Sequence, residues 1–137
     1  MIIAKDNYIN VINEQKSKLI GIFLDLYNLI EQKTIKVDIK KILNDLYDYA
    51  RGSFPLEEKL LYHFNYPNKY KHISEHCWFI NKINEFIELA GKDNYEVLIV
   101  DIFNFLAFWI ENHIEKSDYL FFKNLYNLKN KAYLNKN

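Results

Sequence analysis

Apolar residues recur at intervals of three and four along most of the chain, which is the spacing of one face of an α-helix. Three glycines and two prolines are too few for the turns of a β-sandwich or barrel. The pattern predicts an all-α protein with four long helices. We expect them from about Asn13 to about Gln32, from near Lys36 to just before Asn65, from about Asn68 to Ala90, and from near Asp93 through His113.

Each expected helix carries an apolar stripe that can pack into a common core. The stripes are Ile20, Phe23, Tyr27 and Ile30 in the first helix; Ile39, Leu43, Leu46 and Ala50 in the second; Ile80, Ile83 and Ile87 in the third; and Leu98, Ile102, Phe105 and Trp109 in the fourth. Short connections favour antiparallel neighbours, so we expect an up-down-up-down four-helix bundle. The aromatic stretch 119–125 should add a short C-terminal helical segment that packs back on the bundle. Residues 1–137 are expected to form a single domain.

Polar residues also fall on these stripes, where an ordinary core would be apolar. His72 and His76 are four residues apart and therefore lie on one helix face, and His113 continues the stripe of the fourth helix. The other inward-facing polar positions are Lys16, Ser53 and Glu57. Buried ionisable groups are costly unless they pair with one another or bind a metal ion.

The three inward histidines favour a metal site over an ordinary core. Any one of them alone would most simply be a hydrogen-bonded core histidine. Together with Glu57 and Asp118, they form a ligand set of imidazoles and carboxylates. Imidazole nitrogen favours transition metals such as iron or zinc over calcium or magnesium. The sequence therefore predicts a transition-metal site between facing helices.

Composition bears on the partners and the compartment. The chain has 18 basic and 18 acidic residues, so no charge excess favours nucleic acid or an anionic membrane. The apolar stretch 97–110 is interrupted by Asp101 and Asn104, so no membrane-spanning helix is expected. The lone Cys77 rules out an internal disulfide, and the first residues lack the apolar run of a signal peptide. We expect a soluble, cytoplasmic protein.

Four further residues lie near these positions in the sequence but are not expected to take part. His63 falls off the Glu57 face and should be exposed, and Glu58 and Glu75 should be solvated. Cys77 should be a small buried residue rather than a ligand.

The motifs also occur in a characteristic order. They are NEQK at 13–16, SFPLEE at 53–58, YP at 66–67, HISEH at 72–76 and WIENHIEKSD at 109–118. This pattern resembles the bacterial hemerythrins over nearly the whole chain. Members of that family hold two non-heme irons inside a four-helix bundle and usually carry, store or sense dioxygen.

The resemblance assigns a role to each matching residue. It implies that His72, His76 and His113 bind one iron, and that Glu57 and Asp118 are the carboxylates that bridge the two irons. It also implies apolar walls for an oxygen pocket. These are formed by Phe54, Trp109 and Ile114.

Two positions depart from the family pattern. Where the second iron would take two more histidines, this chain has Lys16 and Ser53. An ammonium must lose a proton before it can bind a metal, and a neutral hydroxyl is a weak ligand. We therefore expect no second iron, and we expect the ammonium of Lys16 to take its place beside the carboxylates. Pro55, inside the second helix, raises the question of whether a kink displaces Glu57.

These observations lead to one main hypothesis and two alternatives. The main hypothesis is a hemerythrin-like protein, not an enzyme, that binds one iron per chain, or zinc, and interacts with dioxygen or another small diatomic ligand. Reversible oxygen carriage should be altered or lost, because the family reaction draws an electron from each of two irons. The first alternative is a metal-free degenerate bundle that serves as an interaction or signalling module. The second is an enzyme with oxygen or peroxide chemistry at a single metal.

Overall fold

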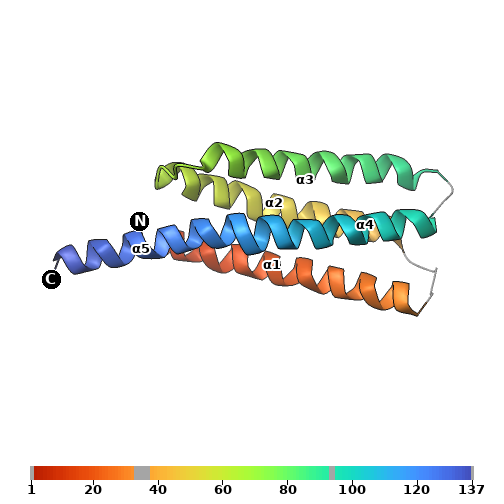
Figure 1. Ribbon diagram of the computed structural model, residues 1–137, viewed down its shortest axis with the longest axis horizontal. Coiled ribbons are helices and arrows are strands. Elements are labelled where there is room, and N and C mark those ends of the chain that lie inside the picture. The colour runs from red at the N-terminus through yellow and green to blue at the C-terminus, as the bar shows by residue number, and fades with distance from the viewer. Residues whose placement is uncertain (1, 33–37, 93–94, 137) are drawn as a thin grey trace.

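The protein is a bundle of long helices, as the apolar periodicity predicted (Figure 1). The computed structural model describes residues 2–32, 38–92 and 95–136. Its elements are α1 (Ile2–Glu31), α2 (Ile39–His63), α3 (Lys69–Ala90), α4 (Tyr95–Trp109), the π-helix η1 (Ile110–Asp118) and α5 (Tyr119–Lys136). Within these residues there is no strand, and the prediction of an all-α four-helix bundle is confirmed.

The helix boundaries differ from the expected ones mainly at the beginning of the chain. Helix α1 begins at Ile2 and runs through Asn13, which was expected to cap it. The expected starts near Lys36 and Asp93 lie outside the described residues. Asp38 caps α2 instead, because its side chain accepts a hydrogen bond of 3.1 Å from the backbone N–H of Lys41.

The buried face of α1 is also not the one expected. Ile12, Leu19 and Leu26 are buried, whereas Ile20 is 40% exposed and Tyr27 is 48% exposed. The physical reason is that apolar residues lie on several faces of α1 between positions 19 and 27, so its own sequence does not select a single stripe.

The expected stripe of α3 is likewise only partly correct. Ile83 is buried as expected, but Ile87 is 45% exposed, and Phe79 and Phe86 take the buried positions. By contrast, the stripes expected for α2 and α4 are buried throughout their described length.

The C-terminal third of the chain is helical without interruption from Tyr95 to Lys136. Helix α5 is 18 residues long and continues in line with α4 rather than folding back on the bundle (Figure 1). Its first turns are anchored by Phe121, which is fully buried and packs on Tyr66 with ring centroids 5.0 Å apart.

This long helix includes a stretch that is apolar enough to cross a membrane by length and composition, within Tyr95–Lys131. The sequence analysis predicted no membrane-spanning helix. A core helix of a bundle meets the same criterion, and Leu98, Ile102 and Leu106 are buried in this one. The observation is therefore weak evidence for a membrane span.

The apolar core has two parts, which lie on either side of a buried polar layer. Along α2, Ala50 and Phe54 belong to the larger part, and Leu60 and Leu61 belong to the smaller part. The polar layer lies between these positions. It consists of Ser53, Glu57, His72, His76, His113 and Asp118, all of which are buried.

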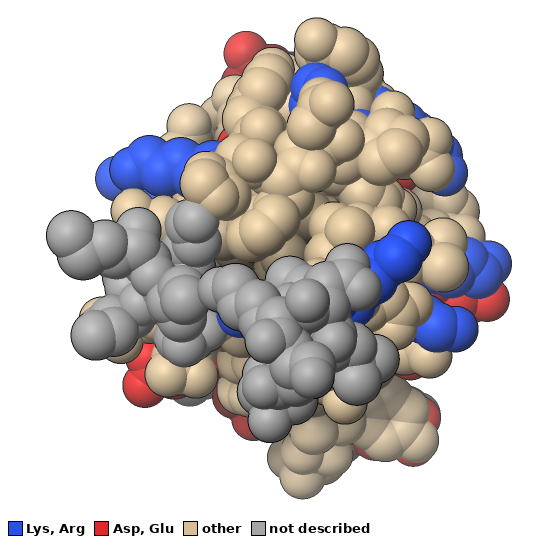
Figure 2. Space-filling model, turned by 90° about the vertical axis from the view of Figure 1, so that its left-hand side faces the viewer, with Lys and Arg blue, Asp and Glu red and all other residues tan. Residues whose placement is uncertain are grey.

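Charged residues are dispersed on the end of the bundle that carries the α2–α3 connection. Figure 2 shows this end, where uncharged side chains occupy the upper centre and Lys and Arg stand apart from one another around the rim. The part of this face that belongs to described residues shows no continuous patch of one sign, which agrees with the zero formal net charge of the chain.

Candidate metal centre

The buried polar layer draws its side chains from α2, α3 and the η1 segment. Helix α2 supplies Ser53 and Glu57, and α3 supplies His72 and His76. The η1 segment supplies the other two buried members, His113 and Asp118. At its edge lies Lys16 of α1, whose side chain is 15% exposed. The structure thus brings together every ligand residue expected from the sequence.

The π-helical turn of η1 explains how His113 and Asp118 reach the same place. In an α-helix, residues five apart point about 140° away from each other. A π-helix is wound more widely, with hydrogen bonds from residue i to i+5, and therefore brings such residues back towards one face. Such turns are frequent at functional sites.

Pro55 does not displace Glu57. Helix α2 continues through Pro55 from Ile39 to His63, and the Glu57 side chain is fully buried within the polar layer. Gly52 allows α1 to approach α2 closely here, since a Cβ atom at this position would lie 3.0 Å from Cδ of Gln15.

One oxygen of each buried carboxylate faces the imidazoles: Glu57 Oε1 lies near all three, and Asp118 Oδ1 near two. Glu57 Oε1 lies 3.1 Å from His72 Nε2, 3.6 Å from His76 Nε2 and 3.9 Å from His113 Nε2. Asp118 Oδ1 lies 3.0 Å from His72 Nε2 and 3.1 Å from His113 Nε2. The three Nε2 atoms and the two carboxylates therefore converge on one small volume.

The second oxygen of each carboxylate faces the residues that depart from the family pattern. Ser53 Oγ donates a hydrogen bond of 2.6 Å to Glu57 Oε2. Lys16 Nζ forms an ion pair of 3.3 Å with Asp118 Oδ2 and also lies 4.4 Å from the ring centroid of Phe122. Lys16 therefore reaches into the site rather than extending away into water.

The outer nitrogens of two imidazoles have carboxylate partners. His76 Nδ1 donates to Glu58 Oε2 at 3.0 Å, and His113 Nδ1 donates to Glu75 Oε1 at 2.8 Å. Because a carboxylate only accepts, these bonds place a proton on Nδ1 and leave Nε2 of the neutral ring free to bind a metal. The expectation that Glu58 and Glu75 are merely solvated was wrong.

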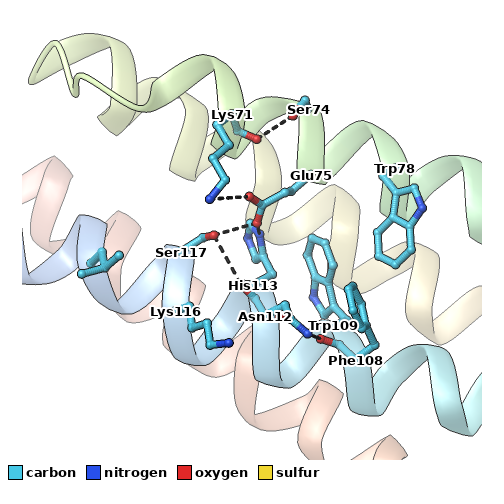
Figure 3. A pocket seen from close by; sticks show the side chains of 11 residues that line it. Lys71, Ser74, Glu75, Trp78, Phe108, Trp109, Asn112, His113, Lys116 and Ser117 are labelled. Carbon is cyan, nitrogen blue, oxygen red and sulfur yellow. Dashed lines mark hydrogen bonds and ion pairs between the residues drawn. The ribbon is translucent and has the colours of Figure 1, made fainter.

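Ser117 holds Glu75 in position for this contact. Its Oγ donates a hydrogen bond of 2.7 Å to the same oxygen, Oε1, that accepts from His113 (Figure 3). Carboxylates that orient a histidine in this way are common around metals bound by protein imidazoles.

Burial and the close contacts shift the pKa values of the cluster in opposite directions. Burial would raise the pKa of Glu57, but the close approach of His113, His72 and His76 outweighs it and holds that pKa well below its usual range. Burial would lower the pKa of His113, but its contacts with Asp118, Glu57 and Glu75 raise it well above its usual value. The pKa of His72 is raised for the same reason, by Asp118 and Glu57. Without a metal, these pKa shifts favour charged His72 and His113 imidazoles beside the charged Glu57 carboxylate.

The donor set fits a transition metal. Four side chains, Glu57, His72, His76 and His113, each offer a ligand atom within 4.8 Å of the others, and all four are buried. His76 Nε2, His113 Nε2 and both oxygens of Asp118 are buried without a well-formed hydrogen bond among the described residues. Such unsatisfied atoms are costly, and three imidazoles with carboxylates are a ligand set suited to iron or zinc.

Comparison with known proteins agrees with this arrangement. The family described as "Hemerythrin HHE cation binding domain" matches residues 7–125. The chain belongs to the hemerythrin family. A protein named bacteriohemerythrin, from Clostridium acetobutylicum, is 27% identical over 124 residues, which is 86% of this chain and 96% of that protein. The hemerythrin family is one of non-heme metal-binding proteins, in agreement with the buried cluster of Glu and His residues.

Two of the three apolar residues that the hemerythrin resemblance assigned to a ligand pocket lie directly against the cluster. Phe54 stacks on His76 with ring centroids 3.9 Å apart, and Trp109 stacks on His113 at the same separation. Ile114 is half-buried and packs against the larger part of the core. Two aromatic rings thus cover the imidazoles.

Two other sequence expectations have different outcomes. His63 is exposed, as expected. Cys77 was expected to be buried but is exposed, because it follows His76 on α3 and turns to the outer face of that helix.

Proposed function

We propose that this hemerythrin-family protein is a soluble, cytoplasmic single-domain protein that binds one iron ion per chain. The ligands are His72, His76 and His113, completed by Glu57 and Asp118. The observation that carries the proposal is the convergence of the histidine Nε2 atoms and the Glu57 carboxylate within 4.8 Å of one another in a buried site.

The surroundings support a role in binding a small diatomic ligand such as dioxygen. A ferrous ion held by these residues would coordinate such a ligand. Phe54 and Trp109 cover the imidazoles with apolar rings, which limits the approach of water and of larger polar molecules. The relative named bacteriohemerythrin supports the same assignment. We propose a binding or sensing protein rather than an enzyme, and zinc is the other metal that suits the ligands.

Lys16 and Ser53 support a limit of one metal. They contact the outer oxygens of Asp118 and Glu57, where a second metal would need vacant ligand atoms. A positive charge at this position also relieves the repulsion between two carboxylates in a low-dielectric interior. The ammonium of Lys16 thus takes the part of a second cation, and reversible oxygen carriage by an iron pair is altered or lost.

A matched pair of histidine variants tests the ligand assignment. His76→Ala removes one inward imidazole and should lower iron affinity by more than about a hundredfold, since an outer partner alone is worth 10–100-fold. His63→Ala removes an exposed imidazole and should leave affinity unchanged. Iron content after equilibration with a competing chelator measures both. Equal losses in the two variants would refute the assignment.

The structure also offers an argument for the metal-free alternative. The contacts of Lys16 with Asp118 and of His72 with Glu57 give the buried charges partners without any metal. A bundle of this kind can persist as an interaction or signalling module. Purified protein that takes up neither iron nor zinc, while remaining folded, would favour that function.

A further inference from the structure

A surface groove runs beside the candidate metal centre, between α3 on one side and α4 with η1 on the other. Its volume is about 550 Å³, within the range of roughly 300–1,000 Å³ that is usual for small-molecule sites. Glu75 and His113 lie in its wall. The groove therefore reaches the outer side of the histidine cluster from solvent.

The groove has an aromatic end. Trp78 of α3 is 37% exposed and Phe108 of α4 is 54% exposed, and their ring centroids are 5.5 Å apart in an edge-to-face arrangement. Trp109 lies behind Trp78, with ring centroids 6.3 Å apart. Figure 3 shows these rings together at one end of the groove. Exposed aromatic faces of this kind favour a planar apolar group.

The opposite end of the groove is basic. Lys71 on α3 and Lys116 on η1 both line it and are both exposed. Lys116 has no ion-pair partner among the described residues. Lys71 Nζ lies 3.9 Å from Glu75 Oε2, a long contact of an exposed side chain that costs little to exchange for another anion.

The carboxylate in the groove wall is already engaged. Glu75 Oε1 accepts hydrogen bonds from His113 Nδ1 and Ser117 Oγ. Its charge is directed inward, towards the imidazole. Two lysines therefore outweigh it at the basic end.

We propose that this groove binds a small aromatic carboxylate, with the ring against the exposed faces of Trp78 and Phe108 and the carboxylate at Lys71 and Lys116. Two features favour this class of ligand: the positive charges of the two lysines complement a carboxylate, and the aromatic end of the groove is separate from the basic end. The site is distinct from the metal site, since it uses none of the inward Nε2 atoms. Glu75 and His113 both lie in the groove wall, so a ligand bound there would lie beside the histidine cluster.

Calorimetric titration with 1-naphthoate and with the neutral 1-naphthamide tests the proposal. We expect saturable binding of one naphthoate per chain, at least about threefold tighter than naphthamide, since an exposed ion pair contributes up to about 1 kcal/mol, or roughly fivefold in affinity. Naphthoate binding should also weaken as salt is added. Absence of saturable binding, or equal affinity for the two probes, would overturn it.

Four variants locate the binding. Lys71→Gln and Lys116→Gln should each weaken naphthoate roughly threefold and leave naphthamide unchanged, whereas Lys82→Gln, on α3 but outside the groove, should affect neither probe. Trp78→Ala should weaken both probes, with circular dichroism verifying the fold. Should Trp78→Ala unfold the protein, Phe108→Ala provides the same test at a more exposed position. Equal effects of Lys82→Gln and Lys116→Gln would contradict the proposed site.

Discussion

Lys16 Nζ lies 3.3 Å from Asp118 Oδ2, and the Lys16 side chain is 15% exposed while that of Asp118 is fully buried. The other oxygen of Asp118 faces His72 and His113. One carboxylate thus lies between a fixed ammonium and the imidazoles. We propose that this relationship limits the chain to one metal ion.

Restoring imidazoles at both departing positions should create a second metal site. In the double variant Lys16→His, Ser53→His, two neutral nitrogens would face the outer oxygens of Asp118 and Glu57, a ligand set that suits ferrous iron. We expect a second iron per chain and new oxygen-dependent absorbance. Each single variant should gain much less, because one histidine leaves the second metal short of ligands.

Iron content and optical spectra of the double variant provide the measurement, with circular dichroism as the check on folding. A folded double variant that keeps its first metal but takes up no second iron would show that Lys16 and Ser53 are not the obstacle.

Removing the carboxylate behind His113 should weaken metal binding without removing a ligand. Glu75→Ala leaves His113 Nδ1 without its partner, so iron affinity should fall by about 10–100-fold. Glu75→Gln retains an acceptor and should lose less. Glu85→Gln, an exposed change on the same helix, is the matched control. Competition with a chelator measures each affinity, and wild-type affinity in Glu75→Ala would argue against an orienting role.

The stability of the metal-free protein should depend on pH in two opposite ways. Folding raises the pKa values of His72 and His113. Their contribution to the stability of the folded protein is therefore complete below about pH 6.5 and is lost as the pH rises through the raised values. Folding lowers the pKa of Glu57, so the contribution of Glu57 to the stability of the folded protein is complete above about pH 4.5 and is lost as the pH falls. We expect the metal-free Tm to be highest in weak acid.

Bound metal should remove the alkaline part of this dependence, because metal replaces the protons on the imidazoles and its affinity rises as they deprotonate. Thermal unfolding between pH 6 and 9 measures the effect, with a Tm decrease of about 3 °C or more expected for metal-free protein, the equivalent of roughly 1 kcal/mol. A metal-free Tm that is constant over this range would contradict the charge arrangement described for the cluster.

The sequence predicts some elements of this structure better than others. The buried stripe of α2 was predicted correctly from Ile39 to Leu61, because the polar and apolar faces of this helix are well separated in the sequence. The face of α1 was misjudged because Leu19 and Ile20 are both apolar neighbours, and only packing decides that Leu19 is the buried one.

The candidate site shows the same limits. His72 and His76 could be paired from their spacing alone, since both lie on one helix. The partner of His113, Glu75, is 38 residues distant, and a contact across helices leaves no periodic signal in the sequence. The π-helical turn that brings Asp118 to the site is likewise a tertiary outcome, because α-helical spacing would point it elsewhere.

Metal stoichiometry tests the central claim most directly. Protein purified without added metal, then loaded with ferrous iron under anaerobic conditions and separated by gel filtration, should be analysed for iron, zinc and protein. The account predicts one tightly bound metal per chain, lost in His76→Ala and retained in His63→Ala. Two irons per chain in the unmodified protein would contradict the role given to Lys16 and Ser53, and no metal in the folded protein would contradict the proposed metal site.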